Sequence, residues 1–446
     1  MNVLILDTDA TGLDLAYRAA EAGHAVRWWV PPHKDGSKAR DGEGFTGIEK
    51  VSAWKPHMAW AKSGIIINLF NDQKLTTELD RWRSFGMPIF GPTVKSANLE
   101  WNRGDGMNFM EQHGIEVPEY TEFKNFDEAL KFAWKAQDPF VFKPMGDEED
   151  KSLTYVASDP ADLVGWMMMK KSNGLKMKGS CILQKKIDLI AEMGVSAWVG
   201  KNGFLPGKFN LNFEFKKLMN QDYGPATGEM GSICRYVDDD KLAREVLIPF
   251  EESMVKLGHI GDFDIGCGID KHGKAWPMEF SNRFGWPSTQ ILMACHESDP
   301  VEWMRDAVVS GKDTLQVDDR MSIGIVMARP PFPNKNDDPQ SSVGYPISGL
   351  EDVWDHVSPW QMMLEDGPVM EGGKMITTQP IYKTTGEYVC VVTAKGSDVH
   401  DVVAEVYETV DRIKFADRMV RTDVGAKLEK QLPKLHSLGY AVDMEY

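Results

Sequence analysis

The chain has 446 residues, of which 42% are hydrophobic and 26% charged, and its formal net charge is -17 at pH 7. This length exceeds one ordinary core, so we expect two to four domains. The negative charge argues against nucleic acid as a partner, because neutralising phosphates needs a basic surface. The longest apolar run, GIIINLF from Gly64, is too short to cross a bilayer, so no membrane span is expected.

The N-terminus and the cysteines bear on the cellular compartment. The chain begins MNVLILDTDATG, without the basic segment and cleavage site of a signal peptide, which predicts a cytoplasmic protein. The five cysteines are scattered and never spaced as CxxC, so we predict neither disulfides nor a thiolate metal site. We expect them to be small core residues.

The first hundred residues alternate short apolar runs with a helical period. MNVLILD reads as a buried strand, the stretch from Asp14 as a helix, and AVRWWV as a second strand. The runs GIIINLF and PIFGPT flank a helical stretch at about 75–85. This alternation predicts a doubly wound parallel sheet. Because DTDA, not a GxGxxG motif, follows the first strand, a nicotinamide oxidoreductase is disfavoured.

The rest of the chain has the pattern of α+β units. We predict strands at FVFKP, LTYVA, CILQK and GVSAWVG within residues 121–200, and at MSIGIVMA, MITTQPIY and EYVCVVTAKG from Met321 onward. Amphipathic helices are predicted at about 398–413 and 424–433. The segment RPPFPNKNDDPQSSVGYP reads as a long surface loop.

The stretch FVFKPMGDEEDKS places Lys143 at the end of a predicted strand and Lys151 eight residues later, with four acids between them. Two cations fixed on adjacent strands can hold the phosphates of one nucleotide. A solvated hairpin with a charged tip explains the same pattern equally well. The stretch alone leaves both interpretations open.

A second candidate set follows the predicted strand CILQK. Backbone groups from Gln184 through Lys185 to Ile187 can read the edge of an adenine, and the carboxylate of Glu192 can accept ribose hydroxyls. Each of these residues, taken singly, is more often a surface polar group. The nearby loop YGPATGEMGS has three glycines that would let backbone amides approach an anion, a weak signal by itself.

The most specific stretch, GDFDIGCGIDKHGKAWPMEFSNRFGWPSTQ, reads as a β-hairpin that turns at DKHG. Its second strand ends with Glu279, Asn282 and Arg283. A carboxylate and an amide oxygen suit Mg²⁺, which takes few protein ligands and shares the rest with phosphate oxygens. Arg283 can hold a carboxylate or an acyl phosphate bidentately. An arginine–glutamate pair that closes the hairpin is the structural alternative.

Several strings occur in the order of one known family. They are FGMPIFGPTVKSANLE, HGIEVPEYTEF, GPATGEMG, IDKHGKAWPMEFSNRFGWPSTQ, GEYVCVVTAKG and MVRTDVGAKLEKQL. Over nearly its whole length the chain resembles the phosphoribosylamine–glycine ligase family of the ATP-grasp superfamily. The resemblance implies an ATP-grasp fold of α/β and α+β class. It implies a doubly wound domain at 1–100, an ATP-grasp domain at 101–318 with a lid subdomain at about 120–200, and a C-terminal α+β domain at 319–446.

The resemblance also implies an activity in purine biosynthesis. The family uses ATP to convert the carboxylate of glycine to an acyl phosphate, which the amine of phosphoribosylamine then attacks. The expected cofactors are ATP and Mg²⁺ or Mn²⁺, and the expected partners are a small glycine-like amino acid and an amine. The expected assembly is a monomer or a homodimer.

Individual residues fall on the family's functional positions. The resemblance assigns phosphate contacts to Arg103, Lys143 and Lys151, the metal to Glu279, the acyl site to Arg283, and the substrate loop to Glu214 and Lys216. Three departures stand beside these matches. Acids replace the glycine-rich lid, Ser281 replaces a metal-binding asparagine, and DTDATG replaces a glycine-rich turn around the phosphoribosyl substrate.

These departures shape the hypotheses. Asn282 or Asp264, on the paired strand, would supply the missing metal ligand, and Asp7 and Asp9 would repel a phosphate. The first hypothesis is an ATP-dependent carboxylate–amine ligase that acts either in purine synthesis or on a related acid and amine, with an altered amine acceptor. The second is an ATP-binding regulatory or assembly subunit whose catalysis is impaired.

Overall fold

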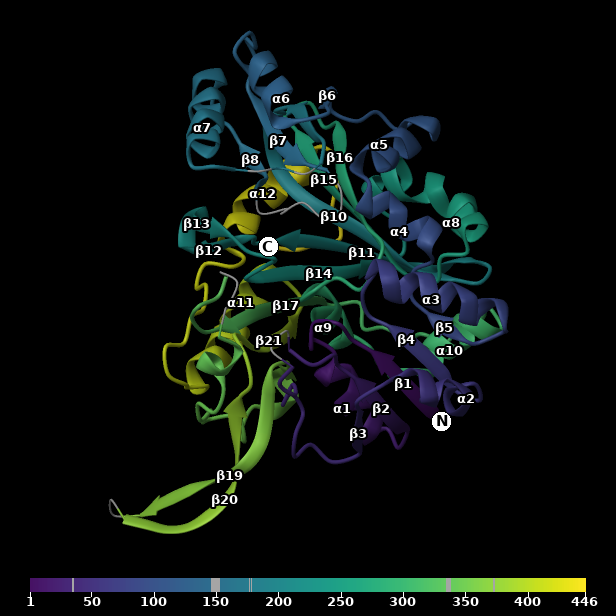
Figure 1. The fold of residues 1–446 in the computed structure, drawn as a ribbon, viewed down its shortest axis with the longest axis vertical. Coiled ribbons are helices and arrows are strands. Elements are labelled where there is room, and N and C mark those ends of the chain that lie inside the picture. Colours follow the sequence, from purple (N-terminus) through teal and green to yellow (C-terminus); the bar gives the residue numbers. More distant parts are fainter. Residues whose placement is uncertain (34–35, 146–152, 176, 178, 334–337, 372–373) are drawn as a thin grey trace.

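The computed structural model describes residues 1–33, 36–145, 153–175, 177, 179–333, 338–371 and 374–446. In Figure 1 an N-terminal unit, drawn in purple, lies beside a long central sheet, and a small unit drawn in blue caps the opposite end. A hairpin in light green projects from the body.

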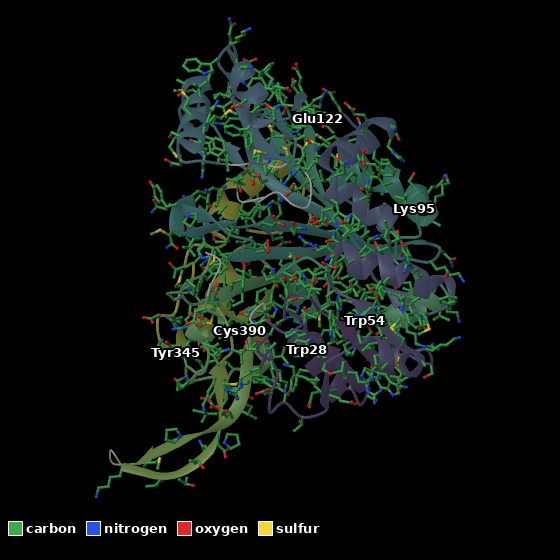
Figure 2. The ribbon with its side chains drawn as sticks, viewed as in Figure 1. Trp28, Trp54, Lys95, Glu122, Tyr345 and Cys390 are labelled. Atoms are coloured by element: carbon green, nitrogen blue, oxygen red, sulfur yellow. The ribbon has the colours of Figure 1, made fainter. Side chains whose placement is uncertain are left out.

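The N-terminal unit is a parallel sheet in the order β3-β2-β1-β4-β5. Its strands are β1 (Asn2–Leu6), β2 (Ala25–Trp29), β3 (Ile48–Val51), β4 (Ile65–Asn68) and β5 (Ile89–Phe90). Val3 and Ile5 pack in the same core as Trp28, whereas Leu4 packs in a second core with Trp54; both tryptophans are labelled in Figure 2. Burial on both faces is typical of a doubly wound sheet, so this prediction is confirmed.

Helices connect these strands and lead to the next unit. They are α1 (Leu13–Glu21), α2 (Met58–Ala61), α3 (Gln73–Ser84), α4 (Val94–Trp101) and α5 (Arg103–Gln112). Asn102 caps α5, because its side-chain oxygen accepts from the backbone N–H groups of Gly104 and Asp105. This cap fixes the first residue of the helix, Arg103, at the edge of the central sheet.

The small unit has its own antiparallel sheet in the order β6-β9-β7-β8. It contains β6 (Tyr120–Phe123), α6 (Phe126–Ala133), β7 (Phe140–Pro144), β8 (Tyr155–Val156), α7 (Pro160–Ser172) and β9 (Cys181–Lys185). Phe126, Phe142, Leu163 and Met167 pack in a core separate from the rest of the molecule. A separate core lets this unit hold the end of β7 over the central sheet.

The central sheet runs in the order β16-β15-β10-β11-β14-β17-β21-β18. Its strands are β10 (Leu189–Gly200), β11 (Gly203–Glu214), β14 (Gly231–Val237), β15 (Gly261–Asp270), β16 (Ala275–Ser281), β17 (Met321–Ala328), β18 (Val357–Pro359) and β21 (Tyr388–Gly396). The hairpin predicted to turn at DKHG is β15–β16. Because β17 pairs with β14, the predicted boundary at 318/319 falls between strands of one sheet, and the three-domain division stays a prediction.

The remaining elements surround this sheet. They are β12 (Lys217–Met219), β13 (Tyr223–Ala226), α8 (Glu251–Leu257), α9 (Ser288–Met293), α10 (Glu302–Val309), the projecting hairpin β19 (Met362–Glu371) and β20 (Lys374–Thr384), α11 (Val399–Arg412) and α12 (Ala426–Ser437). The two predicted C-terminal helices correspond to α11 and α12. Among the described helices none is both long and apolar enough to cross a membrane.

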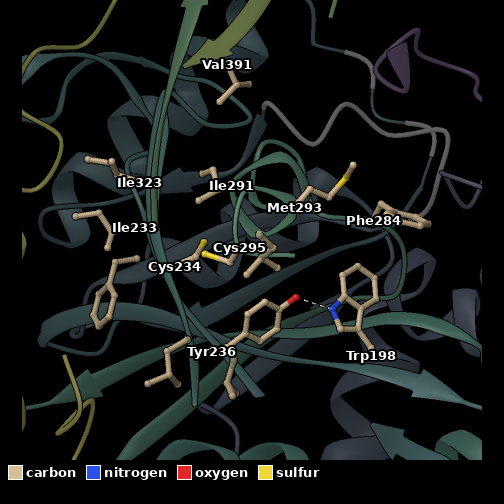
Figure 3. Packing of buried hydrophobic residues seen from close by; sticks show 14 of the residues in the cluster. Trp198, Ile233, Cys234, Tyr236, Phe284, Ile291, Met293, Cys295, Ile323 and Val391 are labelled. Atoms are coloured by element: carbon tan, nitrogen blue, oxygen red, sulfur yellow. Dashed lines mark hydrogen bonds between the residues drawn. The ribbon is translucent and has the colours of Figure 1, made fainter. Parts of the chain in front are cut away.

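The main core includes residues of several strands of the central sheet, some of which Figure 3 shows. The indole N–H of Trp198 donates to the hydroxyl of Tyr236 over 2.8 Å, and Phe284 packs 5.8 Å from Trp198 between ring centroids. This packing anchors the chain directly after β16. All five cysteines are free and buried, which confirms that they are core residues.

Replacing Tyr236 with phenylalanine should lower the free energy of unfolding. The substitution leaves the buried indole N–H of Trp198 without an acceptor, and a buried unpaired donor costs about 1–3 kcal/mol. We expect the midpoint of urea unfolding, measured by tryptophan fluorescence, to be lower than that of the parent protein. Tyr223→Phe is the control because Tyr223 is 66% exposed; equal midpoints for the two variants would contradict the prediction.

Candidate active site

Two cavities adjoin where the small unit faces the central sheet. The larger, about 470 Å³, lies between α4, α5 and the β15–β16 hairpin. The smaller, about 360 Å³, is lined by residues of β7, β9 and β10. They share six lining residues, which are Lys143, Thr154, Glu214, Lys216, Gly266 and Met278. A ligand in the smaller cavity therefore reaches the groups of the larger one.

The smaller cavity collects the predicted adenine and ribose residues. Gln184, Lys185, Ile187 and Glu192 all line it. Gln184 is buried, and the ammonium of Lys185 pairs with a surface carboxylate, that of Asp138, at 2.8 Å. Much of the remaining wall is apolar and comes from Val141, Val156, Leu189, Met193 and Met278. An apolar cleft with a few polar groups at its rim is typical of a site for a flat heterocycle.

Lys143 stands at the junction of the two cavities. It lies one residue before β7 ends at Pro144 and is buried. Burial lowers the pKa of its ammonium to about 8, the guanidinium of Arg103 contributes to this lowering, and the carboxylate of Glu279 opposes the shift. A buried cation beside a second cation favours an anionic ligand.

Ion pairs hold two further cations of the site, Arg103 and Lys216. The guanidinium of Arg103 lies 3.1 Å from the carboxylate of Glu279, and the ammonium of Lys216 lies 2.8 Å from that of Glu214. The carboxylate of Glu214 raises the pKa of Lys216 above its ordinary value, and burial acts against this rise. Both side chains are therefore charged and fixed in orientation.

The β15–β16 hairpin presents oxygen atoms to the larger cavity. In the strand register Asp264 lies opposite Ser281, and Gly266 lies opposite Glu279. All four residues line the cavity. The carboxylate of Asp264 accepts from the amide of Asn212 over 2.9 Å. Burial raises the pKa of Asp264 well above its usual value, and the nearby charge of Glu214 adds to the rise.

Asn282 does not join these oxygen ligands. It is fully buried, and its side-chain amide donates to the carbonyl of Ser96 over 2.5 Å. Asn282 is not one of the described residues that line the two cavities. Its side chain follows the alternation of the strand away from Glu279, so the structure does not bring Asn282 to the predicted metal site.

Arg283 lines the larger cavity. Its Nη1 donates to the carbonyl of Phe284 over 3.0 Å, and its Nε lies 3.6 Å from the carboxylate of Glu100. Burial alone would lower the pKa of the guanidinium, but Glu100 and Asp262 raise it above its ordinary value. The charge therefore stays in the cavity and is available to an anionic ligand.

Glu229 is a cavity residue that the sequence patterns did not indicate. It is 3% exposed, lines the larger cavity and accepts a hydrogen bond of 2.5 Å from the hydroxyl of Ser232. Burial raises its pKa well above the usual value, and the charge of Glu214 contributes. In the sequence, the acid within the loop TGEMG was the only indication of this residue. The glycines of that loop indicated a role for backbone amides instead.

The second lysine of the predicted phosphate clamp, Lys151, and the acidic lid before it lie outside the described residues. Lys143 carries the described part of that prediction. Nine of the residues predicted to bind ATP or the acid are described by the structure and line the two cavities. They are Arg103, Lys143, Gln184, Lys185, Ile187, Glu192, Glu214, Lys216 and Arg283.

Comparisons with known proteins show what the chain is similar to. Residues 105–257 match the family model of the phosphoribosylglycinamide synthetase ATP-grasp (A) domain. A phosphoribosylamine–glycine ligase of Xylella fastidiosa is 28% identical over 356 residues, 78% of each chain. One of Allochromatium vinosum is 27% identical over 437 residues, covering 95% of this chain and 98% of its own. Over most of its length the chain is similar to phosphoribosylamine–glycine ligases, and its central part resembles their ATP-grasp domain.

A solved structure supports the fold independently. The phosphoribosylamine–glycine ligase of Thermotoga maritima has a TM-score of 0.69 and 18% identity, and the match covers 95% of this chain and 100% of that one. The chain is an enzyme, an ATP-grasp ligase that resembles phosphoribosylamine–glycine ligase. The match to an ATP-grasp domain implies the use of ATP and dependence on a divalent metal ion.

The residues of the site fit a divalent ion of the hard class. Glu279, Asp264 and the hydroxyl of Ser281 offer oxygen ligands from one face of the hairpin, and Mg²⁺ is usually held by one or two carboxylates together with phosphate oxygens. Burial raises the pKa values of Asp264 and Glu229, and the charge of Glu214 raises both further. A cation among these carboxylates would relieve their repulsion.

Proposed function

We propose that the chain joins a small carboxylic acid to an amine at the expense of ATP, through an acyl phosphate. The observation that carries the proposal is the set of groups that the two adjoining cavities bring together. The smaller cavity is largely apolar, the buried cation Lys143 lines both cavities, and the carboxylates Asp264 and Glu279 line the larger one together with the guanidinium of Arg283. These groups suit a base, phosphates, a metal and an acid, respectively.

The nucleotide would lie mainly in the smaller cavity. Its base would meet the backbone from Gln184 to Ile187, including Lys185, and its ribose would meet Glu192. Lys143 and Arg103 would contact the phosphates, and Lys151 joins them on the strength of the sequence alone. Such contacts are charge-assisted, so each contributes more than a neutral hydrogen bond.

The metal would bind between the phosphates and the β15–β16 hairpin. Glu279 and Asp264 would hold it, and Mg²⁺ or Mn²⁺ suits their oxygen atoms. When bound, the ion supplies charge neutralisation for the transferred phosphoryl group. Arg103 already pairs with Glu279, so it would shift toward the phosphates as the ion takes over that carboxylate.

The acid would bind at the guanidinium of Arg283. One of its carboxylate oxygens attacks the γ-phosphorus of ATP, the bond to the bridging oxygen breaks, and ADP leaves. The amine nitrogen then attacks the acyl carbon, the C–N bond forms, phosphate departs, and the nitrogen loses its extra proton. Lys216, held by Glu214, would face the charge that develops on the acyl phosphate. Positioning and charge neutralisation supply the catalysis, so no nucleophilic side chain is needed.

We propose that glycine or a close relative is the acid, since the relatives are named for glycine. The acid would also share the cavity between Arg283 and Lys143 with a metal and a triphosphate, which leaves space for a small acid. The second hypothesis, a subunit without catalysis, gains nothing from the site, because the described cations and carboxylates of a ligase are present together.

Hydroxylamine provides a test that does not depend on the natural amine. With ATP, Mg²⁺ and glycine, the protein should release ADP and form glycine hydroxamate, because hydroxylamine traps an acyl phosphate. Small acids other than glycine, tested in parallel, define the acid. The proposal fails if ADP release is independent of every acid or if no hydroxamate accumulates with any of them.

A further inference from the structure

A third cavity, of about 480 Å³, lies between the turn after β1, the loop after β2 and the segment before β21. Its acidic lining residues in the described chain are Asp9, Asp41 and Glu387, and His33 also lines it; lysine and arginine are absent from that described lining. The carboxyl of Asp41 is buried, and it accepts from the hydroxyl of Thr385 over 2.5 Å. The cavity therefore has a negative wall.

In the turn after β1, a carboxylate of the protein itself occupies the backbone amides that could bind an anion. The buried carboxylate of Asp7 accepts from the backbone N–H groups of Asp9 over 3.1 Å and Gly12 over 2.7 Å. It also accepts from the indole of Trp28 over 3.1 Å. Amides at the start of a helix ordinarily favour a phosphate, but here a side chain of the same turn holds them. An incoming phosphate would meet carboxylates instead of donors.

The third cavity adjoins the acid end of the active-site cavity. Burial raises the pKa of Asp9, and Arg283 is close enough for its guanidinium to oppose this rise. On the opposite wall, the hydroxyl of Tyr388 lies against the backbone of Gly228, where a methyl group on the Cα would sit 3.3 Å from it. Gly228 and Arg283 line the active-site cavity, whereas Asp9 and Tyr388 line the third.

We propose that this cavity binds the amine acceptor, and that the acceptor carries a positive charge and no phosphate. The inference rests on the proposed ligase function and names the substrate class of its second half-reaction. Asp9 and Glu387 would attract an ammonium or a cationic tail, because opposite charges attract. The nitrogen would then point past Tyr388 toward the acyl group at Arg283.

Within the described part of the chain, Lys50 and Arg283 are cations near the negative wall. The ammonium of Lys50 faces Asp41 and donates to the carbonyl of Ala39 over 2.6 Å, so it neutralises part of the charge of Asp41. Arg283 belongs to the acid site. Asp9 accepts only from the hydroxyl of Thr8, over 2.9 Å, among the side-chain contacts described, and is therefore the carboxylate best placed to meet a cation.

The test compares amines that differ by one phosphate. Glycine hydroxamate formation is measured while ethanolamine, O-phosphoethanolamine, 1,4-diaminobutane or phosphoribosylamine, formed from ribose 5-phosphate and ammonia, competes with hydroxylamine. We expect ethanolamine and 1,4-diaminobutane to inhibit at concentrations at least tenfold lower than O-phosphoethanolamine and phosphoribosylamine. Equal or better competition by either phosphorylated amine overturns the proposal, and so does the absence of competition by every amine.

A charge variant ties the effect to this cavity. Asp9→Asn should raise the inhibition constant of 1,4-diaminobutane at least fivefold and change that of O-phosphoethanolamine in the opposite direction. The control is Glu21→Gln, an exposed acid of α1 that does not line the cavity, which should leave both constants unchanged. Failure of hydroxamate formation with every acid refutes the proposed ligase, whereas hydroxamate formation with the wrong order of amines refutes only the acceptor.

Discussion

Glu279→Gln should reduce turnover by at least two orders of magnitude while the protein stays folded. The carboxylate is one of two that the hairpin offers to a metal, and its charge also balances Arg103 across 3.1 Å. Metal coordination stabilises the transferred phosphoryl group by several kcal/mol, and about 2.7 kcal/mol corresponds to a hundredfold change in rate. The measurement is hydroxamate formation at saturating ATP, followed over a series of Mg²⁺ and Mn²⁺ concentrations.

The metal series separates two roles of Glu279. If the carboxylate holds the ion, the residual activity of the variant requires more metal, and Mn²⁺ restores it better than Mg²⁺. If the carboxylate only orients Arg103, the metal requirement stays that of the parent protein. Glu111→Gln is the control, because Glu111 is exposed on α5 and lines neither cavity. Retained activity in Glu279→Gln would remove this residue from the metal site.

Local patterns explain how much of the site the sequence could predict. Lys143 ends an apolar strand, and Glu279 and Arg283 follow a hairpin with a clear turn. Asn282 was a candidate metal ligand, but the alternation of the strand points its side chain away from Glu279, and there it donates to the carbonyl of Ser96. Residues within one or two adjacent strands are therefore accessible to sequence reasoning.

Long-range pairing explains what the sequence could not predict. Glu229 precedes β14, and it lines the same cavity as Asp264 of β15 although β11 and β10 lie between those two strands in the sheet. The third cavity likewise joins the turn at Asp9 to Tyr388, nearly the full chain apart. No local period encodes the order of antiparallel strands, so the neighbours of these residues emerge only from the fold.

Lys143→Ala should weaken ATP binding at least tenfold at pH 7. It should also abolish most of the fall in ATP affinity that the parent protein shows at alkaline pH. The ammonium is buried at the junction of the two cavities, and a hydrogen bond to a charged group contributes about 1.5–3 kcal/mol, where about 1.4 kcal/mol is a factor of ten in affinity. Isothermal calorimetry with ATP, at fixed Mg²⁺, measures the loss. Lys124→Ala, an exposed lysine outside both cavities, should bind ATP like the parent protein.

The pH dependence follows from the sign of the pKa shift. Burial lowers the pKa of Lys143 to about 8 in the free protein, and bound phosphates favour the charged form, so they raise it. Below pH 8 the lysine is already protonated and binding takes up no proton. Above pH 8 it must gain a proton to bind ATP, so the affinity of the parent protein should fall by up to about tenfold per pH unit. In Lys143→Ala this decline should disappear; a parallel decline in both proteins would show that another group titrates, and that Lys143 does not meet the phosphates.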